Sequence, residues 1–145
     1  MTYADSSFLL SLLGNDGNTL AAHAWAAGLK SPPLIPWTAF GAFEFNNAAR
    51  SLAFRRVIDT GILRKIQARL RQQLSNGMME PAPLPVYLHY QEAERLSRLH
   101  TVRNGSRSLD VLHVAAARVL GARTFLTFDG RQAAFAALAG LSCVP

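Results

Sequence analysis

With 145 residues, half of them hydrophobic, the chain is long enough to bury a core without disulfides or a structural metal, and we expect one domain over residues 1–145. Cys143 is the only cysteine, which excludes an internal disulfide and the zinc sites that are built from several cysteines. The 15 Lys and Arg residues outnumber the 9 Asp and Glu residues, for a formal net charge of +6. This excess favours a polyanionic partner, although positive charge also serves solubility alone.

No targeting or membrane-spanning segment is apparent in the sequence. Asp5 interrupts the apolar stretch that a signal peptide would need. The nearly apolar run from Ala133 to Val144 is too short to cross a bilayer. With only one cysteine as well, we expect a soluble, cytoplasmic protein that has no membrane partner.

The first half of the chain is expected to hold two short strands and four helices. Tyr3 and Ala4 form a strand that ends at Asp5, and residues 34–37 form a second strand, in which Pro36 favours a position at a sheet edge or a strand end. The four helices, with their bounding residues, are Phe8 to Leu13 after Ser6 or Ser7, Asn15 to Leu29 before Pro32-Pro33, Thr38 to Arg56 with Thr38 as N-cap, and the amphipathic Ile62 to Leu74.

The second half begins with a proline-rich segment from Asn76 to Pro85, which we predict to be a loop. The elements expected after it are a helix from Tyr87 to Val102, a helix from Leu109 to Leu120 capped by Ser106 or Ser108 and closed by Gly121, a strand from Thr124 to Phe128, a helix from Gly130 to Ala139, and a strand from Leu141 to Val144. Strands that alternate with helices favour an α/β domain with a mainly parallel sheet.

Carboxylates stand where such a sheet would bind a ligand. Asp5 and Asp129 each follow a predicted strand, and ligands of parallel sheets bind beyond the carboxyl ends of the strands. Glu44 lies mid-helix between Phe43 and Phe45, where an apolar setting calls for a counter-ion. Clustered carboxylates suit Mg²⁺ or Mn²⁺, ions that activate water for phosphodiester hydrolysis. Without a metal they should repel one another, which would raise the pKa of at least one.

Each of these acids also has a purely structural explanation. Asp5 and Asp129 precede helices and suit the N-cap position, and Asp110 lies in a first helical turn, where the helix dipole favours a carboxylate. His113 follows Asp110 by one turn, and a lone histidine of this kind is more often a hydrogen-bonded core residue than a ligand. We interpret it as a residue that orients a carboxylate.

Four segments, in order along the chain, resemble the PIN-domain ribonucleases, particularly the VapC-type toxins of bacterial toxin–antitoxin systems. The segments are Tyr3 to Ser7, Thr38 to Asn47 with Glu44, Asp110 to Ala117, and Phe125 to Gln132. The resemblance implies a PIN-like three-layer α/β/α domain with a mainly parallel sheet, and Mg²⁺- or Mn²⁺-dependent cleavage of RNA. The catalytic residues and metal ligands that it implies are Asp5, Glu44, Asp110 and Asp129, with Ser6, Thr127, His113 and Arg131 as accessory residues.

Basic and apolar residues indicate the partners. Arginine makes bidentate phosphate contacts, so Arg55, Arg56, Arg64 and Arg69 are candidates for RNA binding, with a merely solvated helix face as the alternative. The segment from Thr38 to Leu74 carries more apolar side chains than one small core absorbs, which favours an exposed interface. The resemblance implies two occupants of such a surface, a second copy in a homodimer and a cognate antitoxin protein.

The sequence lacks residues that two other enzyme classes would need. A haloacid-dehalogenase-like phosphatase would need a second aspartate two residues after Asp5, where Ser7 stands. A receiver domain would need a lysine at the end of a late strand, and neither Lys30 nor Lys65 is placed there. The alternative that stays open is a catalytically silent PIN-like module that binds RNA or a protein.

Overall fold

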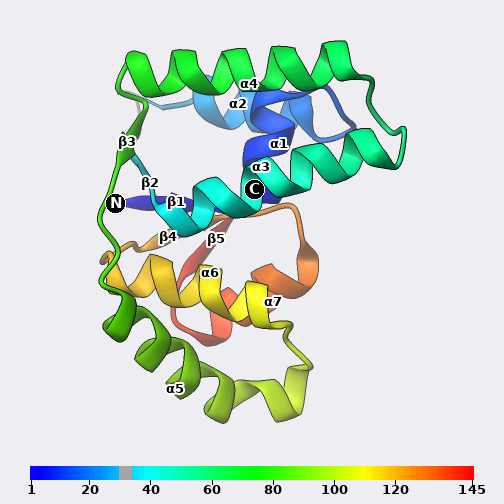
Figure 1. Ribbon diagram of the computed structural model, residues 1–145. Helices are drawn as coiled ribbons and strands as arrows, with labels where there is room; N and C mark the ends of the chain where they lie inside the picture. Colours follow the sequence, from blue (N-terminus) through cyan, green and yellow to red (C-terminus); the bar gives the residue numbers. More distant parts are fainter. Residues whose placement is uncertain (30–33) are drawn as a thin grey trace.

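The computed structural model describes residues 1–29 and 34–145, so the predicted break at Pro32-Pro33 lies outside the described residues. Figure 1 shows the elements in chain order. They are β1 (Thr2–Ala4), α1 (Ser6–Leu13), α2 (Thr19–Ala27), β2 (Ile35–Trp37), α3 (Ala39–Phe54), α4 (Thr60–Ser75), β3 (Met79–Pro81), α5 (Val86–Asn104), α6 (Ser108–Val119), β4 (Thr124–Leu126), α7 (Gly130–Leu138) and β5 (Ser142–Val144).

Every strand pair among the described residues is parallel. One sheet has the order β1-β4-β5, with Tyr3 opposite Phe125 and Phe125 opposite Cys143. A second pair, β2 with β3, lies beside β1. Parallel strands present their carboxyl ends at the same edge, so the residues that follow β1 and β4 are brought together there.

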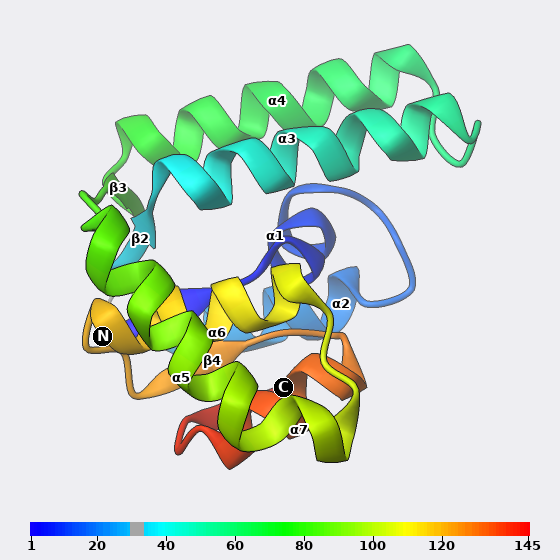
Figure 2. The ribbon, with the colours of Figure 1, turned by 60° about the horizontal axis from the view of Figure 1, so that its bottom comes forward.

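Side chains that alternate along β1 and β4 divide the interior into two cores. Tyr3 and Phe125 belong to the core formed with α5, α6 and α7, whereas Ala4 and Leu126 belong to the core formed with α1 to α4. Figures 1 and 2 show the two groups of helices on opposite sides of the strands. The expected three-layer α/β/α arrangement with a mainly parallel sheet is therefore confirmed.

Several predicted boundaries were wrong. The segment predicted as a loop from Asn76 to Pro85 contains β3, because Met79 is 1% exposed and pairs with Ile35 of β2. Helix α2 begins at Thr19 rather than Asn15, since the side chain of Asp16 bonds to neighbouring groups and forms a turn. Strand β4 ends at Leu126, two residues before the predicted end at Phe128.

Two predicted helix caps gave different results. Thr38 is the N-cap of α3 as expected, and its hydroxyl oxygen accepts a hydrogen bond from the Gly41 N–H at 3.0 Å. For α6, neither Ser106 nor Ser108 is the cap. Arg107 occupies the N-cap position, and its N–H donates to the carboxylate of Asp110 at 3.3 Å. Asp110 is therefore tied to the chain immediately before its own helix.

An ion-pair network connects α6 to its neighbours. The Glu92 carboxylate accepts hydrogen bonds from Arg95 on the same helix and from Arg118 at the end of α6. These partners, Arg95 first, lower the pKa of Glu92 to about 2. Arg118 also donates to the carbonyl of Ala139 after α7. Helix α6, which carries Asp110 and His113, is thereby connected to both α5 and α7.

Within residues 1–29 and 34–145, none of the helices combines the length and the apolar character that crossing a membrane would require.

Candidate active site

All four predicted carboxylates line one cavity of about 350 Å³. Asp5 follows β1 and Asp129 follows β4, so the parallel pairing of these strands sets the two residues at the same sheet edge. Glu44 reaches the cavity from α3 and Asp110 from the first turn of α6. The other lining residues are Ser6, Ser7, Arg107, Ser108, Leu109, His113 and Gln132.

Asp5 is held by three donors although it is only 1% exposed. Its Oδ1 accepts from the Phe8 N–H at 2.9 Å, as an N-cap does, and from the Ser7 hydroxyl at 2.8 Å. Its Oδ2 accepts from the Thr127 hydroxyl at 2.6 Å. Burial raises the pKa of Asp5, and these hydrogen bonds oppose the rise. The expected cause of a raised pKa, repulsion among carboxylates, was wrong: loss of hydration is the first cause.

Ser7 and Thr127 connect the ends of β1 and β4. The Thr127 oxygen accepts from the Asp129 N–H at 3.0 Å, and the Ser7 oxygen accepts from the Phe128 N–H at 2.9 Å. Both hydroxyls donate to Asp5, so they fix the distance between the backbones that carry Asp5 and Asp129. Ser6 was predicted as an accessory residue and Ser7 was not, because only the pairing of β1 with β4 brings Ser7 to Phe128.

Asp129 has a capping role as well as its place in the cavity. Its Oδ1 accepts from the N–H groups of Arg131 and Gln132 at 2.9 and 3.2 Å. No hydrogen bond to Asp129 Oδ2 or to Asp110 Oδ1 occurs within the described part of the chain, so each residue keeps one carboxylate oxygen for another partner. Asp110 and Asp129 can therefore each stabilise the start of a helix and still bind another partner in the cavity.

Glu44 faces a histidine rather than a lysine or arginine. Its Oε2 is buried without a hydrogen-bond partner among the described residues and lies 3.7 Å from Nε2 of His113. The expected apolar setting was only half right. Phe45 is fully buried, but Phe43 is 69% exposed, because consecutive helical residues point in different directions.

The donor set fits a hard divalent cation. Four carboxylate residues line one cavity and offer only oxygen ligands, and the buried Oε2 of Glu44 has no hydrogen-bond partner among the described residues. Over residues 1–29 and 34–145, however, no three His, Cys, Asp or Glu side chains lie close enough together to share an ion. Carboxylates repel one another without a cation, so binding of an ion would require Glu44, Asp110 and Asp129 to move toward Asp5, which its three donors hold in place.

The remaining predicted accessory residues differ in their positions. Ser6 lines the cavity, and its buried hydroxyl has no hydrogen-bond partner in the described chain. The side chain of Arg131 is exposed and does not line the cavity, although its backbone N–H caps Asp129. Arg107 is the arginine that lines the cavity, and it was not among the predicted site residues. Its position just before the helix that carries Asp110 could have indicated from the sequence that it lies at the site.

None of the four arginines proposed for RNA binding lines the cavity. Arg69 serves the fold, since its Nη1 donates to the carbonyls of Leu13 and Gly14 at 2.9 and 3.1 Å and satisfies the end of α1. Arg55 follows Glu44 by eleven positions, about 16 Å along a helix, and Arg56 comes next. Arg64 is exposed on α4.

With its fold and cavity described, the chain can be compared with known proteins. The family model of the PIN domain matches residues 2–138, and the chain belongs to the PIN-domain family. No curated protein sequence matches it.

Three solved structures share its fold. VapC20 of Mycobacterium tuberculosis, described as a sarcin-ricin loop cleaving toxin, has a TM-score of 0.69 at 23% identity, with 100% of both chains covered. FitAcB of Neisseria gonorrhoeae has a TM-score of 0.66 at 15% identity, covering 100% of this chain and 97% of the other. PAE2754 of Pyrobaculum aerophilum has a TM-score of 0.60 at 17% identity, covering 99% and 83%.

Proposed function

We propose that the chain, as one PIN domain over residues 1–145, is a Mg²⁺- or Mn²⁺-dependent endoribonuclease and the toxin of a toxin–antitoxin pair. The observation that carries this proposal is the single cavity that Asp5, Glu44, Asp110 and Asp129 all line. Membership of the PIN family supports the nuclease, and the likeness in fold to the toxin VapC20 supports the toxin. A cytoplasmic location is part of this proposal, because it would bring the enzyme to cellular RNA.

The four carboxylates have distinct tasks in this proposal. A bound divalent ion would supply Lewis acidity and a water molecule of lowered pKa. Asp5 is the most rigid ligand because three donors hold it, and Asp129 and Asp110 each offer a free oxygen. Glu44 supplies the fourth carboxylate, from α3. Arg107 is the cation at the cavity mouth, suited to hold a phosphate of the RNA.

The decisive experiment is an RNA-cleavage assay with the purified chain and short single-stranded RNA. We expect cleavage with Mg²⁺ or Mn²⁺, none after chelation with EDTA, and recovery when the ion is returned in excess. RNA that binds and stays intact with either ion would contradict the nuclease and favour the catalytically silent PIN-like module. Cleavage that is unaffected by EDTA would contradict the role of the carboxylates.

Replacing Arg107 with Gln should weaken RNA binding and flatten its dependence on salt. Each lost phosphate contact lowers the slope of log K against log salt by about 1. The measurement is RNA affinity at several salt concentrations, with EDTA present so that the RNA stays intact. Arg123→Gln is the matched control, because Arg123 is exposed just before β4, at the end of that strand away from Asp129, and does not line the cavity. Equal slopes for wild type and Arg107→Gln would remove Arg107 from the RNA site.

We also propose a homodimer and an antitoxin partner. The apolar surplus expected from Thr38 to Leu74 is partly absorbed, since Phe45 is fully buried. Phe54 is nevertheless 88% exposed and Val57 65% exposed, both near the turn between α3 and α4. Exposed apolar side chains that gather in this way favour an interface. An antitoxin that places an Arg or Lys among the four carboxylates would displace the cation and inhibit the enzyme.

A further inference from the structure

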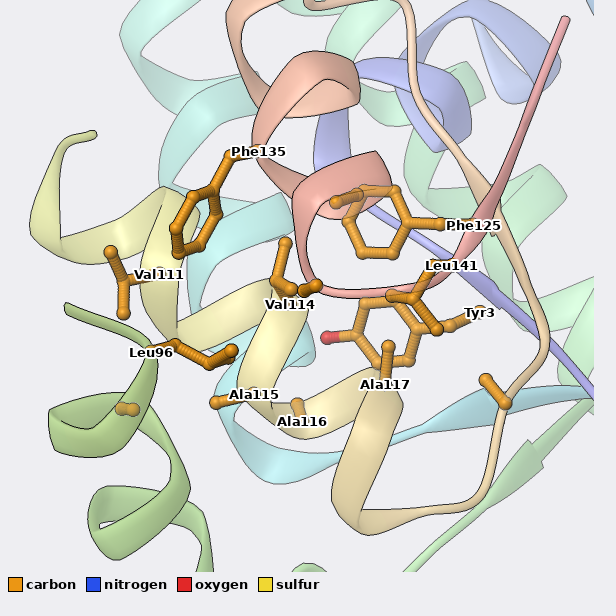
Figure 3. Close-up of a cluster of buried hydrophobic side chains, with 14 residues drawn as sticks. Tyr3, Leu96, Val111, Val114, Ala115, Ala116, Ala117, Phe125, Phe135 and Leu141 are labelled. Atoms are coloured by element: carbon orange, nitrogen blue, oxygen red, sulfur yellow. The ribbon is translucent and has the colours of Figure 1, made fainter. Parts of the chain in front are cut away.

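A chain of polar contacts runs from the buried core to Glu44. Tyr3, on β1, is 1% exposed, and its ring stacks on Phe125 with centroids 5.6 Å apart. Figure 3 shows the Tyr3 ring beside the small side chains of α6, with its oxygen in red. That oxygen lies 2.9 Å from Nδ1 of His113, which is 4% exposed. The other ring nitrogen, Nε2, lies 3.7 Å from Oε2 of Glu44.

The direction of the first hydrogen bond follows from the partners of Tyr3. The ordinary pKa of a tyrosine phenol is about 10, far above neutral pH. Tyr3 therefore keeps its own proton, and the acceptor within reach of that proton is Nδ1 of His113.

The direction of the second contact follows from the chemistry of imidazole. A neutral ring has one N–H donor and one acceptor nitrogen, and the hydrogen bond at one nitrogen sets the state of the other. If Nδ1 accepts from Tyr3, Nε2 carries the proton and presents it to Glu44. In the other tautomer a nitrogen lone pair would face a carboxylate oxygen that has no other hydrogen-bond partner in the described chain.

Aromatic neighbours hold the His113 ring in place. The Phe40 ring lies 4.7 Å away between centroids at an interplanar angle of 54°, and the Tyr3 ring meets His113 edge-on at 63°. A ring flip would exchange both nitrogens with carbons and break the contacts at both ends. Packing therefore holds the plane of the ring, and the contacts of its two nitrogens with Tyr3 and Glu44 decide which way round it lies.

We propose that Tyr3 is a positioning residue for the active site: its hydroxyl fixes His113 in the tautomer with the proton on Nε2, and that N–H points toward the Glu44 carboxylate oxygen 3.7 Å away and attracts it electrostatically. The consequence for metal binding rests on the proposed function, whereas the tautomer does not. If Tyr3 merely filled the core, phenylalanine would replace it without effect, because only the hydroxyl is lost.

The first measurement reads the tautomer by ¹⁵N NMR of the His113 ring near neutral pH, without metal or RNA. In the wild type we expect a protonated Nε2 and an unprotonated Nδ1, and in Tyr3→Phe a mixture of both tautomers. Tyr90→Phe, which removes the hydroxyl of an exposed tyrosine, should leave the His113 signals unchanged. A proton on Nδ1 in the wild type would overturn the proposal, whether or not the chain cleaves RNA.

The second measurement is the affinity for Mn²⁺ in the absence of RNA, determined by electron paramagnetic resonance. Partners that orient a metal ligand are typically worth ten- to a hundredfold in affinity, so Tyr3→Phe should bind Mn²⁺ about tenfold more weakly than wild type and Tyr90→Phe. His113→Gln, whose amide N–H can replace Nε2–H, should keep more affinity than His113→Leu. A folded Tyr3→Phe with wild-type Mn²⁺ affinity, or equal losses in the two His113 variants, would overturn the role of this contact.

Discussion

Asp5→Asn is expected to reduce RNA cleavage at least about a hundredfold without unfolding the protein. Residues that only orient a metal ligand are worth ten- to a hundredfold, and Asp5 is a proposed ligand itself, so its loss should exceed that range. The asparagine oxygen keeps the capping bond to the Phe8 N–H but lacks the charge that binds a cation. The measurement is the cleavage rate of short RNA at saturating Mg²⁺ or Mn²⁺.

A matched control separates the loss of a ligand from the loss of a cap. Asp59 is the N-cap of α4 and accepts from the Ile62 N–H as Asp5 accepts from Phe8, but it does not line the cavity. Asp59→Asn should therefore keep wild-type cleavage. Equal rates for Asp5→Asn and wild type would refute the carboxylate mechanism.

Asp5→Asn should also change how the stability of the protein depends on pH. Burial raises the pKa of Asp5, so the ionised form is disfavoured in the folded state relative to the unfolded state. The wild type should lose stability relative to Asp5→Asn as the pH rises from the pKa of the unfolded state through that raised pKa, and in acid the difference between the two should no longer change with pH. Urea unfolding at several pH values tests the sign. A wild type that becomes relatively more stable as the pH rises would contradict it.

Phe125→Ala should lower the free energy of unfolding by about 3–5 kcal/mol, the usual cost of removing a buried aromatic ring. Phe125 is fully buried in the centre of β4 and stacks on Tyr3. Domains of this kind have a total stability of about 5–15 kcal/mol, so the variant should be at the margin of folding. Urea unfolding of dilute protein measures the difference.

Phe54→Ala is the control for this measurement, since Phe54 is 88% exposed. In dilute protein it should change stability by no more than about 0.5 kcal/mol. If Phe54 lies in the proposed dimer interface, the loss of stability caused by Phe54→Ala should grow with protein concentration, because association stabilises the folded chain by mass action. Equal costs for the two phenylalanines in dilute protein would show that Phe54 is covered within one chain.

Much of the local structure could be predicted because its causes lie within a few residues. Thr38 caps its helix through a group three residues away, and Gly121 has the positive φ of 75° that its position after α6 requires. Helix α4 follows from its apolar stripe. The β3 strand was missed, since its evidence is not local: Met79 is buried only because Ile35 lies beside it.

The sequence by itself determined the class of fold and placed Asp5 and Asp129 after strands, because alternating strands and helices restrict the topology and parallel strands end at one edge. Only the tertiary structure decided that Glu44, Asp110 and Arg107 line the same cavity. It also decided that Arg69 binds the end of α1 and that Tyr3 reaches His113 across 110 positions. These contacts depend on how α3 and α6 are rotated and packed against the sheet. That rotation is set by the whole core, so no local pattern of residues encodes it.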